Sequence, residues 1–230
     1  MQSVNQWATS NGWDYAFMDD AFLALAPASV QKVCGSNIYA LTDICRLEWM
    51  RGALDRGYDR AIWADADVLV FAPQSLQIDE VRGHGFAREV FLQLERSGGV
   101  TPIEGINNAL MFFESGDDTL EVYLQACLDA LQSMEPGKVP RTALGPHLLK
   151  SLDDKRGLNR IERVGLFTQA VMSEIVRGRS SMMNKIVELH GMPLSAANLC
   201  HFLRNATPAH LRAEFDSLYL DGIRRLLASK

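Results

Sequence analysis

The sequence predicts an α/β fold in which helices flank both faces of a central, mostly parallel β-sheet. Segments with a helical spacing of apolar residues alternate with short apolar segments along the 230 residues. Hydrophobic residues make up 47% of the chain, which is enough for a well-packed core. Because alternating helices and strands pack as layered sandwiches, we expect a single domain over 1–230, with 208–230 as a helix packed on it.

The clearest element of the N-terminal half is a long helix over 37–56. Its apolar stripe consists of Ile38, Leu41, Cys45 and Trp49, and Gly57 follows as a stop signal. Asp19 is placed to cap a short helix. The other elements expected in this half are a helix over 2–10 and strands over 13–18, 60–64 and 68–71.

The C-terminal half continues the alternation. Two strands are expected over 83–94 and 106–113, separated by a loop over 97–104. The Gly145-Pro146 pair is typical of a helix start. The remaining elements expected are helices over 117–134, 144–152 and 208–228, and short β segments at 161–167 and 185–189.

Composition narrows the class of protein. The net charge is −5, whereas a nucleic-acid-binding domain normally presents a basic face, so we expect no nucleic-acid partner. The four cysteines form no C-x-x-C pair and are read as buried thiols of a reducing compartment. The sequence shows neither a signal-peptide pattern nor an apolar run long enough to span a bilayer, so we expect a cytoplasmic protein. Nothing in it indicates an oligomeric state.

Two aspartates interrupt the apolar segment AIWADADVLVF at 61–71. Burying an unpaired carboxylate is costly, and residues two apart on a strand point to the same side. Asp65 and Asp67 are therefore predicted to share a ligand at a strand end, and a divalent cation with its diphosphate is the natural candidate. The alternative is a solvated hairpin turn, although Asp-Ala-Asp lacks the Gly, Asn or Pro that tight turns favour.

The preceding helix carries a second polar pair. Asp43 and Arg46 lie three residues apart, so they are neighbours on one helix face, which is distinct from the apolar stripe. An ordinary surface ion pair is the alternative interpretation, and such a pair contributes only tenths of a kcal/mol, roughly, to stability.

Together these residues resemble the GT-A glycosyltransferases that carry a D-x-D sugar-binding motif. The segment TDICR at 42–46, followed after about twenty residues by WADADV at 63–68, is similar to their S/T-D-x-x-R helix and apolar strand ending in D-x-D. The resemblance is closest to the bacterial capsular-polysaccharide and mannosyltransferase-like branch, and more distantly to glycogenin-type enzymes. It is strong over 37–75 and weak from there to 205.

The resemblance implies transfer of a hexose from a nucleotide diphosphate sugar, a UDP- or GDP-hexose, to a glycan or other acceptor, with Mn²⁺ or Mg²⁺ as cofactor. Asp43 would contact the donor sugar or ribose, and Arg46 the sugar or diphosphate. Asp65 would bind the ribose and support the metal, and Asp67 would ligate it. Retention at the anomeric carbon is favoured over inversion.

Three weaker signals follow downstream. Asn107 and Asn108 resemble the family's stretch that lines the sugar and acceptor pocket, and Asn108 is grouped with the catalytic residues. Gly145-Pro146 resembles a helix start near the sugar site, where a helix N-terminus can bind an anion. His201 lies where the family places a late metal or diphosphate contact. No general base is singled out among the candidates Glu89, Glu104, Glu114 and Asp117.

The start of the chain departs from the family pattern. Members begin with a strand that supplies part of the nucleotide-base pocket, whereas this sequence starts at the expected helix over 2–10. Either a divergent first strand is present or the first strand is missing from the sheet. The second case makes a non-catalytic protein that still binds nucleotide-sugars the main alternative. A haloacid-dehalogenase-type phosphatase is a further one, although that class needs a Thr where this chain has Leu69.

Overall fold

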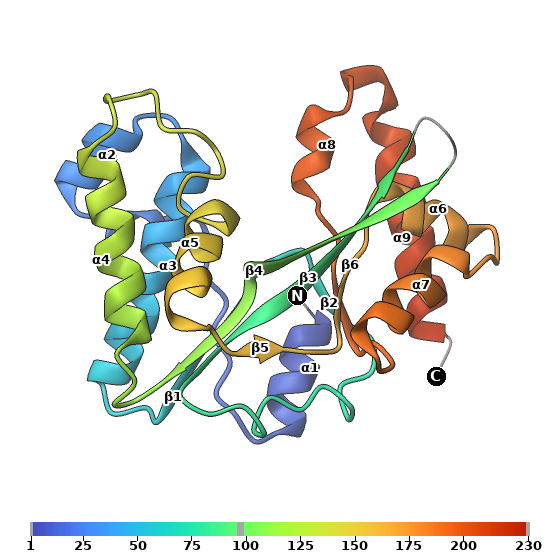
Figure 1. Cartoon of the computed structure of the whole chain (residues 1–230), viewed down its shortest axis with the longest axis horizontal. Coiled ribbons are helices and arrows are strands. Elements are labelled where there is room, and N and C mark those ends of the chain that lie inside the picture. Colours follow the sequence, from blue (N-terminus) through green and yellow to red (C-terminus); the bar gives the residue numbers. More distant parts are fainter. Residues whose placement is uncertain (1, 96–98, 229–230) are drawn as a thin grey trace.

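The computed structural model describes residues 2–95 and 99–228 and is a mixed α/β structure (Figure 1). Its strands are β1 (Arg60–Ala64), β2 (Val68–Val70), β3 (His84–Leu94), β4 (Val100–Glu114), β5 (Arg160–Ile161), β6 (Val164–Leu166) and β7 (Ala196–Asn198). Its α-helices are α1 (Gln2–Ser10), α2 (Ala28–Cys34), α3 (Ile38–Asp55), α4 (Thr119–Gln132), α5 (Pro146–Arg156), α6 (Gln169–Val176), α7 (Ser181–His190), α8 (Phe202–Ala206) and α9 (Arg212–Ala228). The short 3₁₀ helices are η1 (Asp20–Leu25) and η2 (Ala209–Leu211).

The strands form two sheets, one with the order β1-β4-β3-β5 and one with the order β2-β7-β6. The prediction of a mostly parallel sheet is not confirmed. The pairs β1–β4, β3–β4 and β2–β7 are antiparallel, and the parallel pairs β3–β5 and β6–β7 are short. β3 and β4 follow each other directly, and the few residues between them cannot make the crossover that a parallel pair requires.

Helices pack on both sides of the long β3–β4 ribbon, which crosses the molecule obliquely (Figure 1). One core contains apolar residues of α2, α3, α4 and α5 packed against β1 and the inner part of β3 and β4. A second core joins α6, α7 and α9 to the outer part of β3 and to β2 and β7. A third core lies between them and includes Trp7 of α1. In α9, the buried residues are Phe215, Tyr219, Gly222 and Leu226.

Several element predictions differ from the structure. Residues 13–18 form no strand; Trp13 instead packs its ring edge-on against Trp7, with the ring centroids 5.1 Å apart. Residues 185–189 lie in α7, because Met182, Ile186 and His190 recur at helical spacing and are all buried. The expected loop over 97–104 is largely the start of β4, and its residues 97–98 lie outside the described residues. None of the predicted elements corresponds to α2, α6, α8 or β7.

The long helix α3 is confirmed, but its buried face only partly matches the predicted stripe: Cys45 is fully buried, and Leu41 and Trp49 pack against the core. Asn37 caps it by accepting hydrogen bonds from the backbone N–H groups of Tyr39 and Ala40. Ile38 of the expected stripe is 47% exposed, whereas Asp43 and Arg46 are only 6% exposed. The interpretation of that pair as a surface ion pair is therefore wrong, because both side chains lie inside the protein.

The structure begins with α1, and no strand precedes β1 in the part of the chain that is described. None of the helices within 2–95 and 99–228 combines the length and the apolar character needed to cross a membrane.

The end of β4 offers a test of pH-dependent stability. Glu114 accepts hydrogen bonds from Arg60 on β1 and, at 2.7 Å, from the backbone N–H of Gly83. The Arg60 bond, followed by the Gly83 bond, lowers the pKa of Glu114. The resulting stabilisation is present above the unfolded-state pKa of about 4.3 and is lost as the pH falls through the lower folded-state value.

We therefore expect Glu114→Gln to lower the free energy of unfolding at pH 7 by about 1 kcal/mol and by progressively less below pH 4. Urea unfolding at pH 7 and at pH 3.5 measures this difference. Glu121→Gln is the matched control, since Glu121 is exposed and 3.8 Å from Arg51. A loss of the same size at both pH values would contradict the assignment.

Candidate functional site

The chain passes from one sheet to the other at the two aspartates. β1 ends at Ala64, and a turn closed by the hydrogen bond from Val68 N–H to the Asp65 carbonyl (3.0 Å) leads into β2. The Asp65 N–H also donates to the carbonyl of Ala109 at 2.7 Å. The expectation that both carboxylates point to one side of a strand is wrong, because they lie in this turn. A hairpin is also excluded, since β1 and β2 belong to different sheets.

An irregularity in β4 faces this turn. Phe86 of β3 pairs with Met111, but the next residue, Ala87, pairs with Asn107, so residues 108–110 have no partner on β3. The backbone N–H of Ala109 donates to the Asn107 side-chain oxygen at 2.6 Å. Such bulges re-aim side chains and are frequent beside active sites. Here the bulge directs Asn107 and Asn108 toward different groups.

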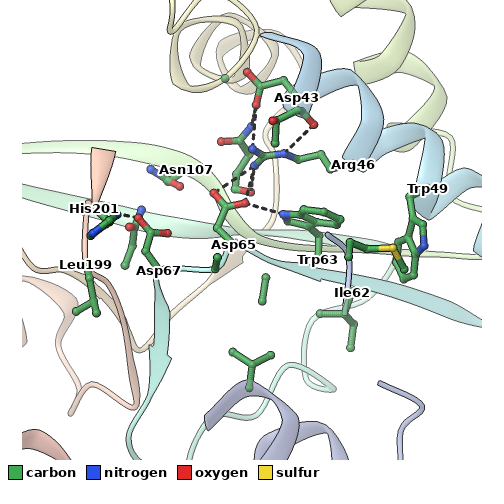
Figure 2. Close-up of a pocket in the computed structure, with 18 of the residues that line it drawn as sticks. Asp43, Arg46, Trp49, Ile62, Trp63, Asp65, Asp67, Asn107, Leu199 and His201 are labelled. Carbon is green, nitrogen blue, oxygen red and sulfur yellow. Dashed lines mark hydrogen bonds and ion pairs between the residues drawn. The ribbon is translucent and has the colours of Figure 1, made fainter. Parts of the chain in front are cut away.

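Arg46 is the centre of a buried polar network that links α3, β4 and the turn (Figure 2). Its Nη1 donates to the carbonyl of Asn108 at 3.0 Å and lies 3.1 Å from Asp65 Oδ1. Its Nη2 lies 3.3 Å from Asp43 Oδ1, which also accepts a hydrogen bond of 2.9 Å from the Asn108 side chain. One guanidinium thus serves two carboxylates from separate parts of the chain.

The protonation equilibria of this network reflect its burial. Desolvation raises the pKa of Asp43 against the opposing effect of Arg46. The pKa of Asp65 is raised to about 6: desolvation is the main cause, Arg46 opposes it, and the nearby Asp67 carboxylate adds to the increase. Burial alone would lower the pKa of Arg46, but Asp65 and Asp43 outweigh it and the pKa is raised. Arg46 pairs with Asp43 and Asp65, and the Asp67 carboxylate adds further negative charge nearby, so the site attracts positive charge.

The N-terminus of α5 adjoins this network. Pro146 occupies the first turn of α5, as predicted. A Cβ on Gly145 would lie 3.5 Å from the Asn108 side-chain oxygen and 3.6 Å from Asp43 Oδ2, so the glycine backbone packs directly on both side chains. A further bond joins Tyr123 to the carbonyl of Leu144 at 2.7 Å and fixes the loop ahead of the helix.

Asp67 points away from Arg46 and toward the C-terminal part of the chain (Figure 2). Its Oδ2 accepts a hydrogen bond of 2.9 Å from the backbone N–H of His201, and its carbonyl accepts one of 3.0 Å from Leu199. The His201 side chain itself is exposed, and its ring lies edge-on to Phe215 with centroids 6.2 Å apart. His201 therefore positions Asp67 through its backbone.

All the residues predicted for the site line one cleft of about 2480 Å³. Two further residues contribute to the cleft: Trp63, whose role the sequence did not indicate, and Glu89, which was one of four candidate bases. Trp63, interpreted as a core residue, donates its indole N–H to Asp65 at 2.6 Å and stacks on Phe22 at the cleft wall. Glu89 of β3 also faces the cleft and accepts a hydrogen bond of 2.7 Å from Asn107. Glu89 and Asn107 lie on the same face of the β3–β4 ribbon, which becomes clear only once the register of the two strands is known.

The described residues form no preformed metal cage, and Asp67 is the carboxylate of the motif that is left open to a ligand. Within the described residues, no three His, Cys, Asp or Glu side chains converge to hold a metal, so Asp65, Asp67 and His201 do not form such a cluster. Asp65 is engaged by Arg46 and Trp63, whereas no hydrogen bond to Asp67 Oδ1 is found among the described residues. Mg²⁺-type ions are commonly held by one or two carboxylates together with phosphates and water.

No family model matches the chain, and no curated protein matches it. Among solved structures, the chain is similar to a glycosyltransferase involved in the glycosylation of the major capsid of PBCV-1, with a TM-score of 0.45 and 14% sequence identity. The alignment covers 93% of this chain and 88% of that one. The functional assignment is therefore drawn from the site itself.

Proposed function

We propose that this protein is a metal-dependent glycosyltransferase with a GT-A-like fold that moves a hexose from a nucleotide diphosphate sugar to a glycan or other acceptor. The observation that carries the proposal is the convergence of Asp43, Arg46 and Asp65 in one buried network, with the open carboxylate oxygen of Asp67 beside it. These are the four residues of the sequence motif, and they come from α3 and from the turn between the two sheets.

In this proposal the two ends of the turn have different roles: Asp67 binds the metal, and the Asp65 end contacts the donor. Asp67 would hold Mn²⁺ or Mg²⁺, which supplies charge neutralisation to the departing nucleoside diphosphate. Arg46 fixes Asp65, and together with Asp43 it presents buried polar groups to the hydroxyls of the donor. Asn107, Asn108 and the Gly145-Pro146 backbone border the space that the sugar would occupy.

The two alternatives can be weighed against the geometry. A phosphatase that used Asp65 as its nucleophile would need this carboxylate free to attack. Asp65 is not free, because it is bound by Arg46 and by the Trp63 indole. A non-catalytic protein that binds nucleotide-sugars fits the same donor contacts and differs only in turnover.

Titration calorimetry with UDP-glucose, UDP-galactose and GDP-mannose, with and without Mn²⁺, tests the proposal. We expect Mn²⁺-dependent binding of one donor. Absence of binding to every donor would contradict the assignment of this site. A second assay measures nucleoside diphosphate released from the bound donor, with water as the acceptor. Slow release indicates an enzyme, whereas binding without release indicates a binding protein.

A further inference from the structure

Two of the partly buried carboxylates that line the cleft lack a cationic partner within the described residues. Elsewhere along the cleft, Arg46 serves Asp43 and Asp65, and Arg60 pairs with Glu114. The remaining two groups are Asp67, which accepts only from a backbone N–H, and Glu89, which accepts only from the Asn107 amide. A half-buried carboxylate without a cationic partner costs stability. Such a group is therefore a candidate for a role in binding or catalysis.

Glu89 is held in place by the β4 bulge. Its backbone pairs with Gly105, and the register places Asn107 diagonally across from it on the same face of the ribbon. The side-chain oxygen of Asn107 accepts a hydrogen bond from the Ala109 N–H. Its side-chain NH₂ group donates to Glu89 Oε2 at 2.7 Å. One carboxylate oxygen of Glu89 is thereby fixed, and no bond to Oε1 is found among the described residues.

Glu89, Asp67 and Cys200 all line the cleft. Both carboxylates raise the pKa of the Cys200 thiol, after desolvation as the main cause, so Cys200 lies near both. The Glu89 pKa is itself raised, chiefly by burial and against the Asn107 bond, which makes its carboxylate a better proton acceptor than an exposed one. The other candidate bases are otherwise engaged: Glu104 pairs with Arg88, and Asp117 hydrogen-bonds the backbone of Thr119.

We propose that Glu89 is the group that takes the proton from the attacking hydroxyl, an inference that rests on the proposed transferase function. The acceptor oxygen forms a bond to the anomeric carbon as the bond from that carbon to the diphosphate oxygen breaks. The electron pair leaves with the nucleoside diphosphate, and the hydroxyl proton moves to Glu89. Such a single displacement inverts the anomeric carbon, contrary to the retention that the family resemblance favours.

The test uses water as the smallest acceptor, so no acceptor needs to be known. Wild type, Glu89→Gln and the control Glu104→Gln are compared in Mn²⁺ with the donor that binds. Glu104 lies on the neighbouring strand, and 54% of its side chain is exposed. We expect Glu89→Gln to keep donor affinity within about threefold and to lower the rate of nucleoside diphosphate release by about 10²- to 10⁴-fold. The control is expected to retain both.

Each outcome is decisive. A Glu89→Gln rate within threefold of wild type overturns the assignment, as does loss of Mn²⁺-dependent donor binding, which would make Glu89 a donor ligand.

Proton NMR of the first-formed hexose is a second measurement, and retained configuration also overturns the proposal. If Glu89→Gln does not fold, Glu89→Asp replaces it, because the shorter side chain displaces the carboxylate. A rate of nucleoside diphosphate release equal to that of wild type would then count against proton transfer to Glu89. Donor binding by wild type without any release contradicts turnover, whereas no donor binding contradicts the proposed function itself.

Discussion

Replacing Arg46 by Met is expected to lower the free energy of unfolding by about 3–5 kcal/mol, the range for removing one partner from a buried ion pair. Arg46 is 6% exposed and balances two carboxylates at 3.1 and 3.3 Å. Without the guanidinium, Asp43 and Asp65 must either stay charged without a partner or bind protons at neutral pH. Urea unfolding monitored by circular dichroism measures the loss.

The same experiment includes two comparisons. Arg51→Met, on the exposed side of α3, changes the same residue type and is expected to cost under about 1 kcal/mol. A triple variant, Arg46→Met with Asp43→Asn and Asp65→Asn, removes all the charges together and is expected to recover at least half of the loss. An Arg46→Met variant no less stable than Arg51→Met would show that the network does not stabilise the fold.

Replacing Asp67 by Asn is expected to weaken Mn²⁺-dependent donor binding on the order of 100-fold, equivalent to about 2.7 kcal/mol. The asparagine oxygen can still accept the His201 N–H, so the turn is preserved while the charge facing the cleft is removed. We expect the free energy of unfolding to change by less than about 1 kcal/mol, since Asp67 is half-buried and has no cationic partner in the described residues.

Asp20→Asn is the control for this prediction, because Asp20 is exposed at the rim of the same cleft. Calorimetric titration of the donor in Mn²⁺ and in EDTA gives the metal-dependent part of the affinity for each variant. Unchanged metal-dependent affinity in Asp67→Asn would remove Asp67 from the metal site. A large loss of stability would instead indicate a structural role.

Local patterns in the sequence identified the elements that carry the site but not their pairing. The strand 60–64 was predicted with the bounds of β1, and the apolar run after Asp67 was identified as β2. The sheet order was missed because strand direction depends on connections and long-range partners, which single-segment periodicity does not report. The continuous apolar run across the aspartates resembled one interrupted strand, whereas the structure divides it between two sheets.

The site residues were identified by motif, but their surroundings were not. Asp43 and Arg46 were placed on a polar helix face, and only the fold reveals that β4 and α5 cover that face. Glu89 could not be separated from Glu104, because neither belongs to the motif: the sequence predicts a strand around Glu89 and the end of a loop at Glu104, and neither position indicates which groups the side chain meets. The β4 bulge makes the difference, since it brings the Asn107 amide to Glu89, whereas Glu104 pairs with the Arg88 guanidinium.

The pairing of β2 with β7 also fixes when the site can form during synthesis. Leu69 pairs with Ala197, and the backbone groups that hold Asp67 belong to Leu199 and His201. A chain emerging from the ribosome can fold the α3–β1 segment and the β3–β4 ribbon early, because those contacts are close in sequence. The turn at Asp67 stays open until residues 197–201 have emerged, so a product terminated before them would carry the whole D-x-D motif and no assembled site.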